Sequence, residues 1–170
     1  MKELVSNLIT VLKNEFEYYQ KLKDLAEIKN QAIIDNDVDE LSQQIEKDKK
    51  VIETLDNLEE KRVDVLVALR EELGLEEGQL EYEVLIENIS DRAGEELNRV
   101  REKLLQVMEE LHQINEQNKV LLQEAIKLNN FSFNMIANIV EPDLDTYTDN
   151  NKSNKNKSDS KIKRIIDRRA

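Results

Sequence analysis

The chain has 170 residues, of which 36% are charged and 39% apolar, and its formal net charge is −12. Three Gly, one Pro and no Cys or Trp exclude turn-rich β-folds, Gly-rich phosphate loops, disulfide frameworks and thiol nucleophiles. The composition is typical of long helices, and the length allows one domain or one long bundle. The acidic charge argues against a general nucleic-acid-binding protein, which would neutralise phosphates with Lys and Arg. No segment approaches the roughly 18 apolar residues that span a bilayer, and no signal-peptide pattern is present, so we expect a cytoplasmic protein.

Residues 3–35 are expected to form the first helix. Apolar side chains recur every seven residues in two adjacent rows, which share one side of a helix. The rows are Val5, Leu12, Tyr19, Ala26 and Ile33, and Leu4, Val11, Tyr18, Leu25 and Ala32. The short polar side chains of residues 35–37 should end this helix, and Asp37 followed by Glu40 resembles a capping box for the next one.

The second helix is expected over residues 38–73. Its inward-facing residues are predicted to be Val38, Leu41, Ile45, Ile52, Leu55, Leu58, Val65, Leu66 and Leu69. Asp48 and Arg62 fall on the same stripe. We expect both at its edge, with side chains that reach out to water; an ion pair inside the bundle is the alternative.

Gly74 and Gly78 mark a helix end, a short helix is expected over residues 80–88, and the longest helix over residues 91–139, before Pro142. One row of this helix is entirely apolar: Val100, Val107, Ile114, Leu121, Leu128 and Met135. A second row on the same side of this helix begins with Leu97, Leu104 and Leu111 and then contains the polar residue Asn118. Either a buried Asn fixes the register there, or the seam opens because the partner helices have ended. The third long helix should outrun the other two by roughly a dozen residues, about 20 Å.

The sequence changes character at residue 141, after an expected bundle domain over residues 1–140. An acidic, turn-rich segment leads into residues 152–170, which hold eight basic and two acidic residues. This tail therefore carries +6 and residues 1–151 carry −18, and the tail should be disordered because it has little to bury. The expected fold class is all-α: an elongated antiparallel three-helix coiled-coil bundle with a longer third helix and a disordered basic tail.

Catalysis and metal binding are not expected. His112 is the only histidine, and Glu109 with His112 forms just half of a ferritin-like carboxylate site, which needs a second copy. The acidic residues are spread as a solvated face with many Glu–Lys pairs at helical spacing. We therefore predict a binding protein without an enzyme activity, a metal or another cofactor.

Residues 128–140 carry no charge, in a chain where more than one residue in three is charged. On a helix, Leu128, Phe131, Met135 and Ile139 face one way, whereas Phe133, Ile136, Ala137 and Val140 face well round from them. Two neighbouring helices cannot cover so much of the circumference. This pattern favours binding of another protein in helix-in-groove fashion; self-association and internal packing are the alternatives.

Three elements in order give the chain its resemblance to a known family. The first is Ala-Ile-Ile-Asp-Asn-Asp-Val-Asp-Glu-Leu at residues 32–41, and the second is Leu-Glu-Glu-Lys-Arg at residues 58–62. The third, at residues 114–122, is an Asn-x-x-Asn-x-x-Leu-Leu motif with Asn115, Asn118, Leu121 and Leu122. From Leu4 to about Tyr147 the layout resembles the FlgN-type flagellar export chaperones, which escort hook–filament junction proteins to the flagellar type III export machinery.

The resemblance implies a substrate-binding surface on the last long helix. Its predicted residues are Leu121, Leu122, Leu128, Phe131, Phe133, Met135, Ile136, Ile139 and Val140. Tyr147 is the implied counterpart of a tyrosine that docks to the cytoplasmic domain of the export gate. The implied partners are hook-associated proteins 1 and 3, bound by a monomer or weak dimer. A generic homo-oligomeric coiled-coil adaptor is the rival interpretation.

Overall fold

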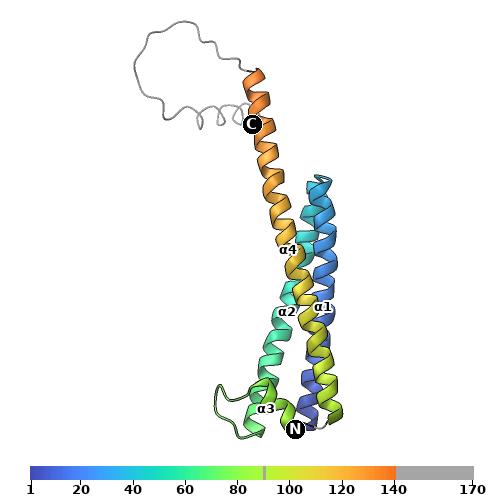
Figure 1. Ribbon diagram of the computed structural model, residues 1–170, viewed down its shortest axis with the longest axis vertical. Coiled ribbons are helices and arrows are strands. Elements are labelled where there is room, and N and C mark those ends of the chain that lie inside the picture. Colours follow the sequence, from blue (N-terminus) through green and yellow to red (C-terminus); the bar gives the residue numbers. More distant parts are fainter. Residues whose placement is uncertain (90, 141–170) are drawn as a thin grey trace, which may run out of the picture. The chain divides into compact units, whose positions relative to one another are not determined.

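The computed structural model describes residues 1–89 and 91–140, and within these ranges all regular structure is helical. The helices are α1 (Lys2–Ile34), α2 (Val38–Glu72), α3 (Tyr82–Glu87) and α4 (Asp91–Val140) (Figure 1). The predicted all-α class is confirmed for this part of the chain. The helix ends lie within two residues of the expected bounds. The tail that was expected to be disordered lies outside the described residues.

The chain divides into two compact units, Met1–Asn130 and Phe131–Ala170, and helix α4 contributes residues to both. The packing described below belongs to the first unit.

The turn between α1 and α2 is built by the short polar residues that the sequence places there. Asn36 adopts a left-handed backbone conformation with φ of 54°, which Asn tolerates better than most residues. The Asp37 side chain then accepts a hydrogen bond from the backbone N–H of Glu40 at 2.9 Å and so caps α2. At the other end of α2, Gly74 adopts φ of 68°, and the N–H of Leu75 donates to the carbonyl oxygen of Arg70.

Side-chain pairs fix the directions of the three long helices within the first unit. Arg62 of α2 lies against Glu15 of α1, and Asp48 lies against Lys29, so α2 runs antiparallel to α1. Helix α4 runs parallel to α1, because three contacts progress in the same direction along both helices. These contacts are Lys13–Glu96 at 2.5 Å, Lys23–Glu110 at 2.6 Å and Asn30–Asn118 at 2.7 Å.

The apolar core of the first unit lies near the N-terminus of α1, where all four helices meet. Leu69 of α2 and Leu97 of α4 are the largest apolar side chains that are almost completely buried. The buried cluster consists of Val5, Leu8, Ile9, Leu12, Leu69, Leu85, Leu97, Val100, Leu104 and Val107. The short helix α3 therefore closes this core through Leu85.

Further along α1 and α2 the contact between the helices contains charged and polar residues, which corrects two predictions. Val38, Ile45 and Ile52 were expected to face inward and are exposed, and Gln44 is buried instead. The residues that face α1 follow alternating steps of three and four, from 41 through 44, 48 and 51 to 55. This row places Gln44 inside, and Ile45 and Ile52 one position to its side.

Asp48 belongs to this inner row, and the same steps continue it through Leu58 to Arg62. Both Asp48 and Arg62 form ion pairs with α1, so the preferred prediction of edge positions is wrong and the alternative holds. The side chains of Lys29 and Asp48 are 17% and 15% exposed, and Glu15 is almost completely buried. Arg62 also pairs with Glu59 on its own helix. These charged side chains are tolerated between α1 and α2 because each one faces a partner of opposite sign on the other helix.

Burial raises the pKa of the Glu15 carboxyl, the Arg62 charge lowers it in part, and the Glu59 charge raises it. Since this pKa is higher in the folded chain, Glu15 adds stability at pH values below the ordinary glutamate pKa. That stability is lost as the pH rises from the ordinary value towards the raised one. The free energy of unfolding of the wild type, minus that of Glu15→Gln, should therefore fall as the pH rises above the ordinary glutamate pKa of 4.5.

Urea unfolding at several pH values measures this difference. Glu17→Gln, at an exposed position of the same helix, controls for the loss of one carboxylate. A difference between the wild type and Glu15→Gln that stays constant with pH would contradict the assignment.

Candidate protein-binding site

Helix α4 loses its cover part of the way along its length. Its inward row is buried from Leu97 through Leu111 and again at Asn118. In the rest of the first unit, Leu121 and Ala125 are half-buried and the other residues from 119 to 130 are exposed. The level of Asn118 therefore marks where α4 ceases to be packed.

Asn118 is held by two hydrogen bonds to α1. Its Nδ2 donates to the backbone carbonyl oxygen of Ala26 at 2.8 Å, and its Oδ1 accepts from Asn30 Nδ2 at 2.7 Å. Ala26 is completely buried, and its small side chain lets α4 approach the α1 backbone. Both ideas raised by the sequence are thus visible: the Asn is buried and bonded, and the seam opens beyond it. Asn115, the other Asn of the motif, is exposed.

The apolar side chains beyond Asn118 are large and mostly solvent-exposed. In the first unit, Leu122 and Leu128 are exposed, the latter by 64%, and Leu121 is half-buried. In the second unit, Phe131 is 62% exposed, and Phe133, Met135 and Ile136 are exposed as well. The predicted residues Ile139 and Val140 lie in the last turn of α4, but their side chains are outside the described residues, as is Tyr147.

Two further exposed apolar residues, Val120 and Ile126, were missing from the prediction. Both stand next to charged residues and off the heptad row, and the search for an uncharged stretch therefore passed over them. The signal that could have found them is the surplus of apolar residues on the outer side of this helix segment.

The chemistry available over residues 128–140 is burial of apolar area, without ionic interactions. Residues 128–140 supply no charged group, and the polar ones are Asn and Ser. Each large apolar side chain contributes about 1.5–3 kcal/mol when a partner covers it completely. A helix of a partner protein that brings a complementary apolar face would suit this surface.

The part of the chain that the structure describes offers no comparable site for a metal ion. Across residues 1–89 and 91–140, no group of three or more His, Asp or Glu side chains is placed to hold a metal ion. His112 is exposed. None of the four helices described has the length and hydropathy needed to cross a bilayer.

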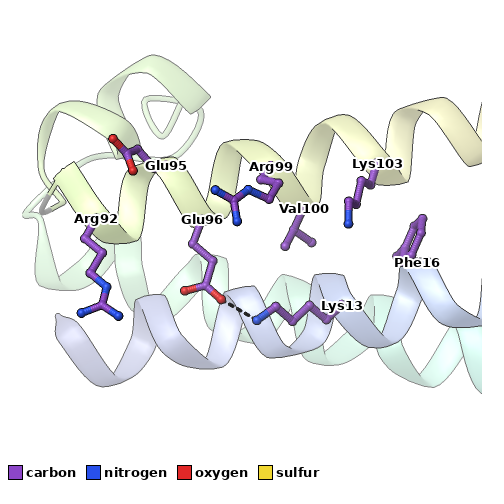
Figure 2. Close-up of a pocket in the computed structure, with 8 residues that line it drawn as sticks. All are labelled: Lys13, Phe16, Arg92, Glu95, Glu96, Arg99, Val100 and Lys103. Carbon is purple, nitrogen blue, oxygen red and sulfur yellow. Dashed lines mark hydrogen bonds and ion pairs between the residues drawn. The ribbon is translucent and has the colours of Figure 1, made fainter.

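The first unit also contains a polar groove between α1 and α4 (Figure 2). It lies near the start of α4, far along the chain from residues 121–136. Its lining combines four basic side chains with two glutamates.

The described residues thus form an all-helical structure with exposed apolar side chains on α4, and comparison with known proteins gives its family. The family model described as FlgN protein matches residues 1–155, and the chain belongs to the FlgN family. FlgN proteins are flagellar export chaperones and are associated with the binding of hook-associated proteins. The resemblance noted in the sequence is therefore confirmed.

One curated relative is similar over most of its length. The "Uncharacterized protein YvyG" of Bacillus subtilis (strain 168) is 28% identical over 130 residues, which cover 76% of this chain and 79% of that protein. No solved structure matches the chain at a significant level.

Proposed function

We infer that this protein is a cytoplasmic export chaperone that binds hook-associated proteins 1 and 3 through the C-terminal part of α4. It keeps them from assembling before export and delivers them to the export gate of the flagellar type III machinery. The observation that carries this proposal is the run of exposed apolar side chains from Leu122 to Ile136 in a family of flagellar export chaperones.

The physical argument is that an assembly protein must hide its apolar helical segments until it reaches the assembly site. The exposed surface of α4 is rich in apolar side chains and carries no charge over residues 128–140. It covers such a segment by area burial at about 25 cal/mol per Å². Ordering of both segments offsets part of this gain, so binding is reversible. Release then requires only a competing interaction at the export gate.

Delivery to the gate is assigned to Tyr147 by the family resemblance. This residue lies outside the described residues, so the assignment rests on its position after the last helix. The acidic body, with −18 over residues 1–151, keeps the chaperone soluble while its apolar surface is free.

A truncation series tests where the substrate binds. A chain that ends at Gln123 lacks the apolar surface from Ile126 onward, whereas a chain that ends at Val140 lacks only the following segment and tail. In capture experiments with hook-associated proteins, the chain ending at Val140 should retain its partners and the chain ending at Gln123 should lose them. Retention by the shorter chain would contradict the proposed location.

A homo-oligomeric adaptor would use the same exposed surface to pair with a second copy. Light scattering coupled to size-exclusion chromatography distinguishes the two functions. A stable dimer that dissociates when Phe131 and Phe133 become Asp would favour the adaptor over the chaperone.

A further inference from the structure

The groove between α1 and α4 has a volume of about 520 Å³ and belongs entirely to the first unit. Helix α1 contributes Lys13 and Phe16, and α4 contributes the remaining residues. These are Arg92, Glu95, Glu96, Arg99, Val100 and Lys103. In Figure 2 the Lys103 side chain extends from α4 towards Phe16, and a dashed line joins Lys13 to Glu96.

The groove is a positive region in a strongly acidic protein. Lys13 is paired with Glu96, but Arg92, Arg99 and Lys103 have no ion pair among the described residues. The hydrogen bond and charge of Lys13 lower the pKa of the Glu96 carboxyl most, burial raises it in part, and the charges of Arg92 and Arg99 lower it further. With no ion pair to any side chain that the structure describes, these cations can contact an anionic ligand.

Two apolar side chains, Phe16 and Val100, also line the groove. Phe16 is half-buried and Val100 is buried, and the Lys103 ammonium lies 6.0 Å from the centre of the Phe16 ring. A ligand that lies along the three cations therefore also meets an aromatic ring and an aliphatic side chain. The complement of this lining is an acidic segment that also carries apolar residues.

Two features favour a peptide over a nucleic acid. The groove contains the carboxylates of Glu95 and Glu96, and the whole chain carries −12. A phosphate backbone has closely spaced charges along its whole length and meets both carboxylates. Peptide carboxylates are spaced by the side-chain pattern, so a peptide can place them against Arg92, Arg99 and Lys103 and leave the glutamates free.

The spacing of the cations sets the size of the ligand. Arg92, Arg99 and Lys103 lie seven and four residues apart on α4, so they span about 16 Å of helix. A helix of about 12 residues has the same length and can present one carboxylate in each turn.

We propose that the groove between α1 and α4 binds an acidic amphipathic peptide segment of a partner protein, with Arg92, Arg99 and Lys103 facing its carboxylates and Phe16 facing its apolar side chains. This site lies at residues 92–103 of α4, and the proposed export-substrate surface lies at residues 121–140. The proposal does not depend on the export-substrate surface. A chaperone with both sites holds a second partner while its substrate is bound.

The test uses the purified full chain and a fluorescently labelled synthetic helix of about 14 residues, with Glu in each turn and Leu beside it. Fluorescence anisotropy at about 100 mM salt, where the screening length is about 10 Å, measures its dissociation constant. Binding to Arg99→Glu/Lys103→Glu should be at least about tenfold weaker than binding to the wild type. The same peptide with Gln in place of Glu should show a similar loss.

Lys47→Glu/Lys50→Glu is the matched control, because it makes the same change in net charge at exposed positions of α2. It should bind the acidic peptide within about threefold of the wild type. Circular dichroism verifies the fold of each variant, and Arg99→Gln/Lys103→Gln provides a milder version with an intermediate loss. Equal losses for the two charge-reversed pairs, no saturable binding by the wild type, or tighter binding of a single-stranded oligonucleotide would each overturn the proposal.

Discussion

Replacement of both Phe131 and Phe133 by Asp is expected to weaken binding of a hook-associated protein by at least about 100-fold. Each Phe side chain contributes about 1.5–3 kcal/mol when a partner covers it, and about 1.4 kcal/mol corresponds to a tenfold change in affinity. Both side chains are exposed in the free chain, so their removal costs little folding stability. Isothermal titration calorimetry measures the affinity, and thermal unfolding followed by circular dichroism measures the stability.

Asn129→Asp/Asn130→Asp is the matched control for this double variant. It introduces two carboxylates at exposed positions of the same stretch of α4 and leaves both Phe side chains in place. The control should lose less than about tenfold in affinity. A loss as large as that of the Phe variant would mean that charge alone, and not the aromatic surface, governs binding.

The second large effect concerns the core. Leu97→Ala is expected to lower the free energy of unfolding by about 2–5 kcal/mol, as is usual when a buried Leu is truncated. Leu97 is 1% exposed and belongs to the buried cluster in which α1, α2, α3 and α4 meet. Urea unfolding measures the change. Leu105→Ala, at a 49% exposed position on the same helix, should cost less than about 1 kcal/mol. Similar losses for both variants would contradict the location of the core.

The helices themselves were predictable because local signals determine where a helix begins and ends. Asp37 caps α2 as its sequence pattern suggested, and Gly74 adopts the left-handed conformation that ends it. Heptad rows such as Val5 and Leu12 also identified the buried side of α1. These features depend on residues within a few positions of one another, so the sequence contains them directly.

The charged seam between α1 and α2 was not predictable from apolar periodicity. A search for apolar rows selects Ile45 over Gln44 because Ile is the more hydrophobic of the two. The structure reverses this choice because the inner row also contains Asp48 and Arg62, whose partners are Lys29 and Glu15. Lys29 and Asp48 are 19 positions apart in the sequence, and Glu15 and Arg62 are 47 positions apart. No local pattern reveals pairs at such separations.

The exposure of the C-terminal part of α4 was foreseen in part. The absence of charge at residues 128–140 drew attention to Phe131 and Met135, and both are exposed. The level at which cover ends depends on which residue of α1 lies beside Asn118, and that register comes from tertiary contacts. Val120 and Ile126 were missed because they stand next to Lys119 and Lys127, outside the uncharged stretch.

The two ion pairs between α1 and α2 also constrain how these helices can slide along one another. Glu15 precedes Lys29 on α1 by fourteen positions, and Asp48 precedes Arg62 on α2 by the same number. A slip of two heptads would set Glu15 against Asp48, or Lys29 against Arg62, and so oppose like charges. A slip of one heptad in either direction would set Glu15 against a leucine and leave a buried charge without a partner. The charges thus make the native alignment of the hairpin distinguishable from its nearest alternatives, which uniform leucine rows would leave almost equal in energy.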